Sequence, residues 1–233
     1  MKKRLKINGV IIFLAVILLI SFPALFFRSA EESPWGAVAK IFGVSLILFG
    51  QILRACARGY KSEHSQSGHS LIQGGPYTLV RNPMYLGILF IGLGIVLTLF
   101  KWWVIIIFLS IFIWRYILLI FKEEEKLLAM FPREYADYQQ KVPRVLPSFK
   151  AILQKDIAGY LPLKLVWLKK ESGSIIALLF LLLFMEGWVD IKNSGLKVFL
   201  GDAILFFSIA VSFIFLTIYL IRCTNNRQKY ASG

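Results

Sequence analysis

Two short polar stretches interrupt an otherwise apolar chain, and both carry side chains suited to binding a charged ligand. The first lies within the sequence GGPYTLVRNPMYLG at residues 74–87. Its glycines and first proline predict a tight turn, which leaves backbone N–H groups free and lets a ligand come close. Arg81 follows this turn, and its planar guanidinium is suited to gripping a carboxylate at two points. Alternatively, Arg81 would extend to lipid headgroups and the glycines would only turn the chain.

The second polar stretch begins with the sequence EEEKLL. Glu123 and Glu124 could accept hydrogen bonds from ribose hydroxyls or balance a positive ligand. A charge run after an apolar helix also commonly marks the membrane interface, so this stretch alone leaves both interpretations open. Only Lys101 separates the apolar run before these glutamates from the preceding apolar run. A tight helical hairpin is therefore predicted, and it would bring Arg81 and Glu123 to the same membrane surface.

The composition of the whole chain indicates a membrane protein. Of its 233 residues, 58% are hydrophobic, and the mean hydropathy of +0.69 is too apolar for an ordinary soluble domain. Because a spanning helix needs about 20 apolar residues, we predict an all-α, polytopic fold with about six transmembrane helices and a cytoplasmic-face cofactor pocket. The predicted spans are residues 7–27, 35–56, 84–100, 102–121, 174–189 and 198–221. The first is interpreted as a retained helix, because its apolar stretch is longer than that of a normal signal peptide.

The formal net charge of +14 is explained by membrane topology. If the N-terminus is cytoplasmic, only Arg28, Lys101, Lys192 and Lys197 of the 27 basic residues fall in outer loops. This bias follows the positive-inside rule, so membrane lipids are the expected partners of the basic loops and no nucleic acid is expected. We expect a multi-pass protein of the bacterial inner membrane, with its N-terminus and cofactor site cytoplasmic, because the chain is compact and carries no recognisable eukaryotic retention signal.

A short amphipathic helix is predicted after the fourth span. Apolar and aromatic side chains recur there at three- and four-residue spacing, which predicts one buried face. The residues of this face are Leu127, Leu128, Phe131, Tyr135 and Tyr138. Pro132 suits the first turn of the helix, and Pro143 and Pro147 prevent its continuation.

Taken together, these blocks resemble the integral-membrane methyltransferases related to isoprenylcysteine carboxyl methyltransferase and to phospholipid N-methyltransferases. The first block of the shared pattern reads Gly75-Pro76-Tyr77, Arg81-Asn82-Pro83, Tyr85 and Gly87. The second block reads Glu123-Glu124, Leu127, Phe131, Tyr135 and Tyr138, and closes with Val142-Pro143-Arg144 and Pro147. The resemblance covers about residues 40–148. Asn82 stands where many relatives have histidine, so no imidazole chemistry is assigned to that position.

The resemblance implies that S-adenosylmethionine binds at the cytoplasmic face and that a lipophilic or prenylated acceptor arrives from the bilayer. It implies catalytic roles for Arg81, Tyr85 and Glu123. The cofactor would be bound by His69, Tyr77, Arg81, Asn82, Tyr85, Gly92, Gly94, Glu123 and Glu124. Gly92 and Gly94 also have a packing interpretation, because small residues in membrane helices usually permit close helix packing. No metal site is expected, since the chain contains only two histidines.

Three regions follow from this resemblance. Residues 1–34 would form an N-terminal transmembrane helix, and residues 35–150 a membrane methyltransferase core. Residues 151–233 would form a cytoplasmic connector and a C-terminal transmembrane hairpin. The sequence leaves open whether this hairpin serves packing, oligomer contacts or the shaping of a lipid-facing entrance.

The first expectation for the activity is O-methylation of an isoprenylcysteine-like carboxylate. A carboxylate is already ionised near pH 7 and needs no general base, whereas a protonated amine must first lose its proton. Phospholipid N-methylation of the phosphatidylethanolamine type is the alternative. An NADPH-dependent sterol-type membrane reductase ranks below both, because no separate basic pocket for a 2′-phosphate is recognisable. A non-enzymatic scaffold ranks last, since it would leave the two polar blocks without a role.

Overall fold

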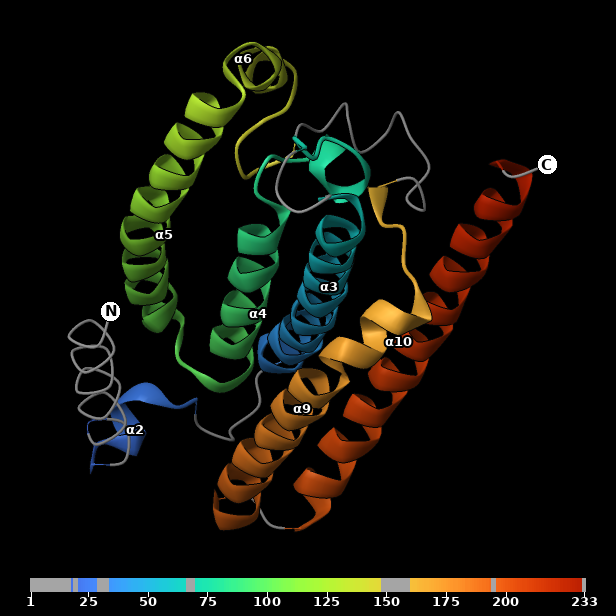
Figure 1. The fold of residues 1–233 in the computed structure, drawn as a ribbon. Coiled ribbons are helices and arrows are strands. Elements are labelled where there is room, and N and C mark those ends of the chain that lie inside the picture. Colours follow the sequence, from blue (N-terminus) through green and yellow to red (C-terminus); the bar gives the residue numbers. More distant parts are fainter. Residues whose placement is uncertain are drawn as a thin grey trace.

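The computed structural model describes residues 18, 21–28, 34–65, 70–147, 160–193 and 196–231. Within these ranges the regular elements are helices and no strand occurs, so the predicted all-α class is confirmed. The elements are α2 (Pro23–Phe26), α3 (Pro34–His64), the 3₁₀ helix η2 (Gly75–Thr78), α4 (Pro83–Leu99), α5 (Trp102–Met130), α6 (Pro132–Lys141), α9 (Leu165–Asn193) and α10 (Leu196–Ala231). Figure 1 shows the long helices side by side, with η2 and α6 at one end and the α4–α5 turn at the other.

Three helices in the described ranges are long and apolar enough to cross a membrane. These segments are Gly36–His64 in α3, Trp102–Met130 in α5 and Ala203–Asn226 in α10. The third predicted span corresponds to α4, which is apolar but shorter. The fifth lies within the long helix α9. Most of the first, residues 7–27, falls outside the described residues.

Helices α3 and α9 are longer than the membrane spans predicted within them. The second predicted span ends at residue 56, whereas α3 continues to His64. The end of the predicted connector is also helical, because α9 begins at Leu165. Hydropathy identifies only the apolar part of a helix. The polar extensions remain helical because neither contains a proline that would end the helix.

Prolines begin four of the described helices. Pro23, Pro34, Pro83 and Pro132 are the first residues of α2, α3, α4 and α6. A proline is favourable there because its missing N–H would have no partner inside the helix. The prediction that Pro132 starts a new helix is confirmed, and this start turns α6 away from α5 (Figure 1).

Glycines allow α3 and α4 to pack with their backbones in contact. A Cβ added to Gly50 would lie 2.7 Å from the Gly87 carbonyl oxygen, and one added to Gly87 would lie 2.9 Å from that of Gly50. A Cβ on Gly94 would collide with the Gly43 carbonyl oxygen. Gly43 and Gly50 therefore permit close helix packing, and this close pair of helices forms the centre of the fold.

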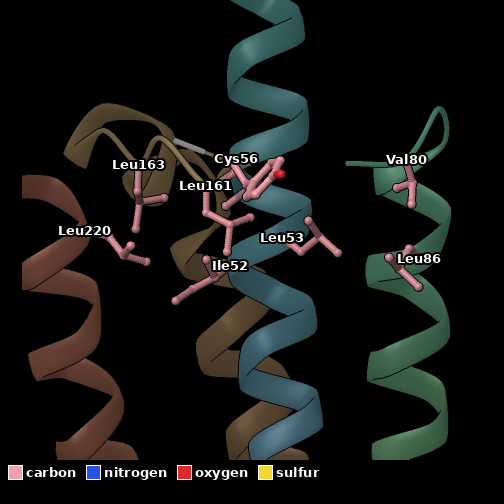
Figure 2. Packing of buried hydrophobic residues seen from close by; sticks show 10 residues of the cluster. Ile52, Leu53, Cys56, Val80, Leu86, Leu161, Leu163 and Leu220 are labelled. Atoms are coloured by element: carbon pink, nitrogen blue, oxygen red, sulfur yellow. The ribbon is translucent and has the colours of Figure 1, made fainter. Parts of the chain in front are cut away.

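The largest buried cluster lies between α3, α4, α10 and the segment that leads into α9. Figure 2 shows side chains from all four parts converging on α3. The labelled members are Ile52, Leu53, Cys56, Val80, Leu86, Leu161, Leu163 and Leu220. The C-terminal hairpin is therefore packed against the core through a shared apolar cluster.

At the opposite end of α4 from Val80, the turn into α5 is bonded to α2. The Lys101 N–H donates to the Phe26 carbonyl oxygen at 2.9 Å, and Lys101 Nζ donates to the Ala24 carbonyl oxygen at 2.7 Å. The rings of Phe27 and Phe100 are stacked with their centroids 4.9 Å apart. These contacts fix the turn between α4 and α5.

Candidate functional site

The α4–α5 hairpin brings the two polar blocks together, as the sequence predicts. The Tyr85 hydroxyl donates a hydrogen bond to Glu123 Oε1 at 2.7 Å, joining the first turn of α4 to α5. Arg81 Nη1 lies 3.6 Å from Glu124 Oε1. Residues about 40 positions apart therefore form one site at the end of the bundle that carries η2 and α6 (Figure 1).

Glu124 is the buried centre of an ion-pair network, with 5% of its surface exposed. Arg144 places Nη2 3.0 Å and Nε 3.1 Å from Glu124 Oε2. Asn82 Nδ2 donates to Glu124 Oε1 at 3.3 Å, on the same oxygen that faces Arg81. Both carboxylate oxygens thus have internal partners, which explains how a charged group is accommodated in a buried position.

A short clasp holds the chain after α6 against the residues that precede α4. The Arg81 N–H donates to the Pro143 carbonyl oxygen at 2.9 Å, and the Asn82 N–H donates to the Arg144 carbonyl oxygen at 3.1 Å. The Asn82 side-chain amide reaches the same Arg144 oxygen at 3.1 Å. Although Asn82 occupies the N-cap position of α4, its side chain makes no capping bond, because its amide is used to join the clasp to Glu124.

Arg144 is a site residue that the sequence analysis did not identify as one. Its guanidinium lies 4.5 Å from the centre of the Phe121 ring, on the same helix as Glu124. The available signal was the arginine within Val142-Pro143-Arg144, whose charge is opposite to that of the acidic run. Nothing in the local sequence indicated which of the adjacent glutamates it would contact.

Glu123, in contrast to Glu124, is exposed. One of its oxygens is held by the Tyr85 hydroxyl. Burial raises the pKa of the Tyr77 phenol, and the negative charge of Glu123 raises it further. Tyr85 also packs against Tyr116 of α5, with ring centroids 5.4 Å apart. An oriented carboxylate bordered by aromatic rings is suited to a ligand that carries positive charge and hydroxyl groups.

Two tyrosines of α6 cover this site. Tyr135 and Tyr138 are buried, and the Tyr138 hydroxyl donates to the Tyr77 carbonyl oxygen at 2.6 Å. Burial raises the pKa of both phenols. The predicted apolar face is narrower than expected, however, since Leu128 is 41% exposed. The break at Phe131 rotates α6 relative to α5, so one continuous periodicity does not describe both helices.

The turn at Gly74 and Gly75, where η2 begins, has the predicted tight geometry. Gly75 has φ = +57°, a conformation that favours glycine. Pro76 follows it and is buried. The Thr78 hydroxyl closes the turn by donating to the Gly75 carbonyl oxygen at 2.7 Å.

Arg81 has unused hydrogen-bonding capacity. Its side chain is only 9% exposed. Nε and Nη1 are buried, and neither makes a hydrogen bond among the described residues, although Nη1 lies within ion-pair distance of Glu124. Buried donors of this kind are costly unless they are paired. The local chemistry therefore fits an additional anionic group, such as the carboxylate of a ligand.

The remaining predicted site residues lie elsewhere. His69 falls outside the described residues. Gly92 faces the ring of Phe108 on α5, and Gly94 faces the backbone of α3 at Gly43. At 1.5 Å per residue, Gly92 lies roughly 15 Å along the helix from Asn82. The structure thus brings together Tyr77, Arg81, Asn82, Tyr85, Glu123 and Glu124, and it places the two glycines in helix packing.

Comparison with known proteins covers the same part of the chain. Residues 38–134 match the family model described as phospholipid methyltransferase. Protein-S-isoprenylcysteine O-methyltransferase of Xenopus laevis is 29% identical over 122 residues, which cover 48% of this chain and 42% of that protein. No solved structure gives a significant match.

Relatives from other organisms give similar coverage. Protein-S-isoprenylcysteine O-methyltransferase B of Arabidopsis thaliana is 30% identical over 131 residues, covering 52% of this chain and 64% of that protein. The Saccharomyces cerevisiae protein-S-isoprenylcysteine O-methyltransferase is 30% identical over 119 residues, covering 47% and 49%. The chain thus spans about half the length of the curated relatives it matches. The predicted resemblance is confirmed over this shared segment.

Proposed function

We propose that this chain, a member of the membrane methyltransferase family that includes isoprenylcysteine and phospholipid methyltransferases, transfers a methyl group from S-adenosylmethionine to a lipophilic acceptor. The observation that carries the proposal is the pairing of Tyr85 with Glu123 across the α4–α5 hairpin. This pairing orients an exposed carboxylate next in sequence to Glu124, which faces the incompletely used donors of Arg81.

The donor set fits the proposed cofactor. S-adenosylmethionine, when bound, supplies an electrophilic methyl group on a positively charged sulfonium. Arg81 would hold its carboxylate through the unused guanidinium N–H groups. Glu123 would accept hydrogen bonds from its ribose or amino group, and the rings of Tyr77 and Tyr85 would border it. Glu124 would contribute indirectly, by keeping Arg81 and Arg144 in place.

The first proposed acceptor is an isoprenylcysteine-like carboxylate. The names of the matched relatives support this choice, and so does the chemistry of the site. A carboxylate near pH 7 has already lost its proton, so no residue here needs to act as a base. The chain would then contribute mainly by binding and orienting the reactants. We place the reaction at the cytoplasmic side of a bacterial inner membrane.

Phospholipid N-methylation is the second candidate, favoured by the family description for residues 38–134. An amine acceptor must lose a proton before it can be methylated. Among the candidate site residues, Glu123 is the exposed carboxylate, so this candidate requires Glu123 to act as the base as well. A reductase would require NADPH binding instead.

The test is calorimetric titration of the detergent-purified full chain with S-adenosylhomocysteine, alongside NADPH. We expect saturable binding of S-adenosylhomocysteine, weakened about tenfold in Glu123→Gln through loss of a charge-assisted contact. Glu125→Gln is the matched control, because Glu125 is exposed on the same helix. Equal binding by both variants would refute the site assignment, and binding of NADPH alone would refute the proposed activity.

The acceptor is tested by radioactive methyl transfer. Two acceptors are offered separately to the full chain in mixed micelles: an N-acylated S-farnesylcysteine and phosphatidylethanolamine. Base-labile methyl ester on the first acceptor is the expected product. Base-stable label on the second would establish the N-methyltransferase alternative.

A further inference from the structure

The ring of Tyr60, near the end of α3, supports the turn at Gly74 and Gly75. A Cβ added to Gly75 would lie 2.8 Å from the Tyr60 ring, and one added to Gly74 would collide with the Tyr60 hydroxyl. The Tyr60 ring is stacked on that of His64, with centroids 3.9 Å apart. The position of this ring therefore determines the path of the turn.

Two further contacts attach the residues on either side of this turn to the same face of α3. The Tyr77 hydroxyl donates to the Ala57 carbonyl oxygen at 3.4 Å, and the Ser70 hydroxyl donates to the His64 carbonyl oxygen at 2.8 Å. Positions 57, 60 and 64 are three and four residues apart, so they share one face of the helix. The loop that leads into η2 consequently follows any movement of the end of α3.

The start of α9 packs against another face of the last turns of α3. The indole of Trp167 lies directly against Gly59, where any side chain would collide with it. Trp167 Nε1 donates to Glu63 Oε1 at 2.7 Å, and Lys164 Nζ lies 2.5 Å from Glu63 Oε2. Trp167 is only 4% exposed, so this contact is a packed interface.

A buried carboxylate of α9 makes further contacts with α3. Glu171 is 4% exposed and pairs with both Arg54, at 3.3 Å, and Arg58. At about 100° per residue, the α9-facing positions 54, 58, 59 and 63 are centred on the side of α3 roughly opposite positions 57, 60 and 64. The last turns of α3 thus lie between the C-terminal hairpin and the candidate cofactor loop.

We propose that the C-terminal hairpin is a positioning element of the candidate site. Trp167 holds the end of α3, and Tyr60 transmits that position to the turn at Gly74 and Gly75. Helix ends open locally when few contacts restrain them, and α9 supplies that restraint here. Trp167 lies outside the matched segment 38–134. The identity of the ligand at the turn rests on the function proposed above, whereas the coupling between hairpin and turn does not.

The coupling is tested without a ligand by hydrogen exchange of the full chain in detergent. In Trp167→Leu, we expect backbone amides of residues 74–80 to exchange about fivefold faster than in the wild type. Amides near the far end of α4, at residues 91–96, should exchange unchanged. Trp114→Leu is the control, because Trp114 is 74% exposed on α5. Unchanged exchange at 74–80 in Trp167→Leu would overturn the proposal.

A milder variant protects the test against misfolding. Glu63→Gln keeps the side-chain shape but loses the charge that holds Lys164 and Trp167. We expect a smaller acceleration at residues 74–80 in the same direction. Trp167→Phe, which retains an aromatic ring against Gly59, should restore most of the protection. Acceleration confined to α9, with none at 74–80, would reject the positioning role.

Ligand affinity gives a second readout through a double-mutant cycle. Trp167→Leu and Tyr60→Leu should each weaken S-adenosylhomocysteine binding about tenfold, and the double variant should also lose about tenfold, because the two residues act in series. A hundredfold loss in the double variant would mean independent effects and would overturn the proposal. If the wild type does not bind this ligand, the proposed function fails while the hydrogen-exchange test still decides the coupling.

Discussion

The hydroxyl of Tyr85 and the carboxylate of Glu123 are joined by a 2.7 Å hydrogen bond between the beginning of α4 and the later part of α5. These residues are 38 positions apart in the sequence. The bond orients one oxygen of Glu123 and leaves the side chain exposed. Its importance can be measured by removing a single oxygen atom.

Tyr85→Phe should lower the affinity for S-adenosylhomocysteine about fivefold, because a lost hydrogen bond contributes about 1 kcal/mol. The ring contact with Tyr116 is retained in this variant. Isothermal titration provides the measurement. Tyr116→Phe is the control, since it keeps the same ring contact without altering Glu123. Equal losses in the two variants would show that the Tyr85–Glu123 bond has no particular role.

Glu124 should matter for folding more than its neighbours do. Glu124→Gln would leave the buried guanidinium of Arg81 without a counter-charge, which is expected to destabilise the protein by about 3 kcal/mol. Glu125→Gln should change stability by less than about 0.5 kcal/mol, because Glu125 is exposed. Thermal unfolding in one detergent compares the two. Similar unfolding temperatures for both variants would contradict the structural role of the Glu124 network.

Gly94→Ala should disturb the close packing of α3 and α4. Its new methyl group would meet the carbonyl oxygen of Gly43, which cannot rotate away as a side chain could. Overpacking of this kind costs about 1–3 kcal/mol. Gly173→Ala is the matched control, because a Cβ there meets nothing within 4 Å. Thermal unfolding should show a loss for Gly94→Ala only, and unaltered stability would remove the packing interpretation.

Alkaline pH should weaken the cover that α6 forms over the site. Burial raises the pKa of Tyr138, whereas the unfolded phenol titrates near its reference value of about 10. A raised folded pKa contributes stability that is complete below about pH 10 and is lost as pH rises above that value.

Tyr138→Phe provides the test of this pH dependence. The variant lacks the titrating phenol and its bond to the Tyr77 carbonyl oxygen. Unfolding temperatures from pH 8 to 11, followed together with tyrosinate absorbance, should fall less steeply for the variant than for the wild type. Parallel slopes would indicate that Tyr138 does not contribute to the alkaline transition.

The sequence predicted the helical class and the meeting of the two polar blocks, because both depend on long apolar runs and a short turn. It could not assign separate roles to Glu123 and Glu124, which differ by one helical position. That choice depends on the rotation of α5, whose buried residues Phe112, Ile120 and Glu124 form one inward stripe. Many exposed side chains of α5 are as apolar as its buried ones. The pattern of hydrophobic residues therefore does not show which face of α5 points inward.

The contact between Arg144 and Glu124 was also beyond local sequence analysis. It depends on the path of the chain after α6, which returns to bond the backbone of Arg81 and Asn82. The helical extension of α3 was missed for a different reason, because its surface is polar although its backbone remains helical. The path of the chain after α6 and the polar end of α3 therefore could not be predicted from the local sequence.

Helices α4 and α5 are joined at a fixed turn at Phe100 and Lys101, so a small change in the angle between them is largest at their other ends. Tyr85 lies roughly 21 Å from that turn along α4. At that distance, rotating α4 about the turn by about 2° moves Tyr85 by about 0.7 Å. Such a movement is enough to weaken its 2.7 Å hydrogen bond to Glu123. The bonds from Lys101 to Ala24 and Phe26 hold the opposite end of this hairpin. A bilayer whose thickness tilted the two helices differently would therefore change the distance between Tyr85 and Glu123.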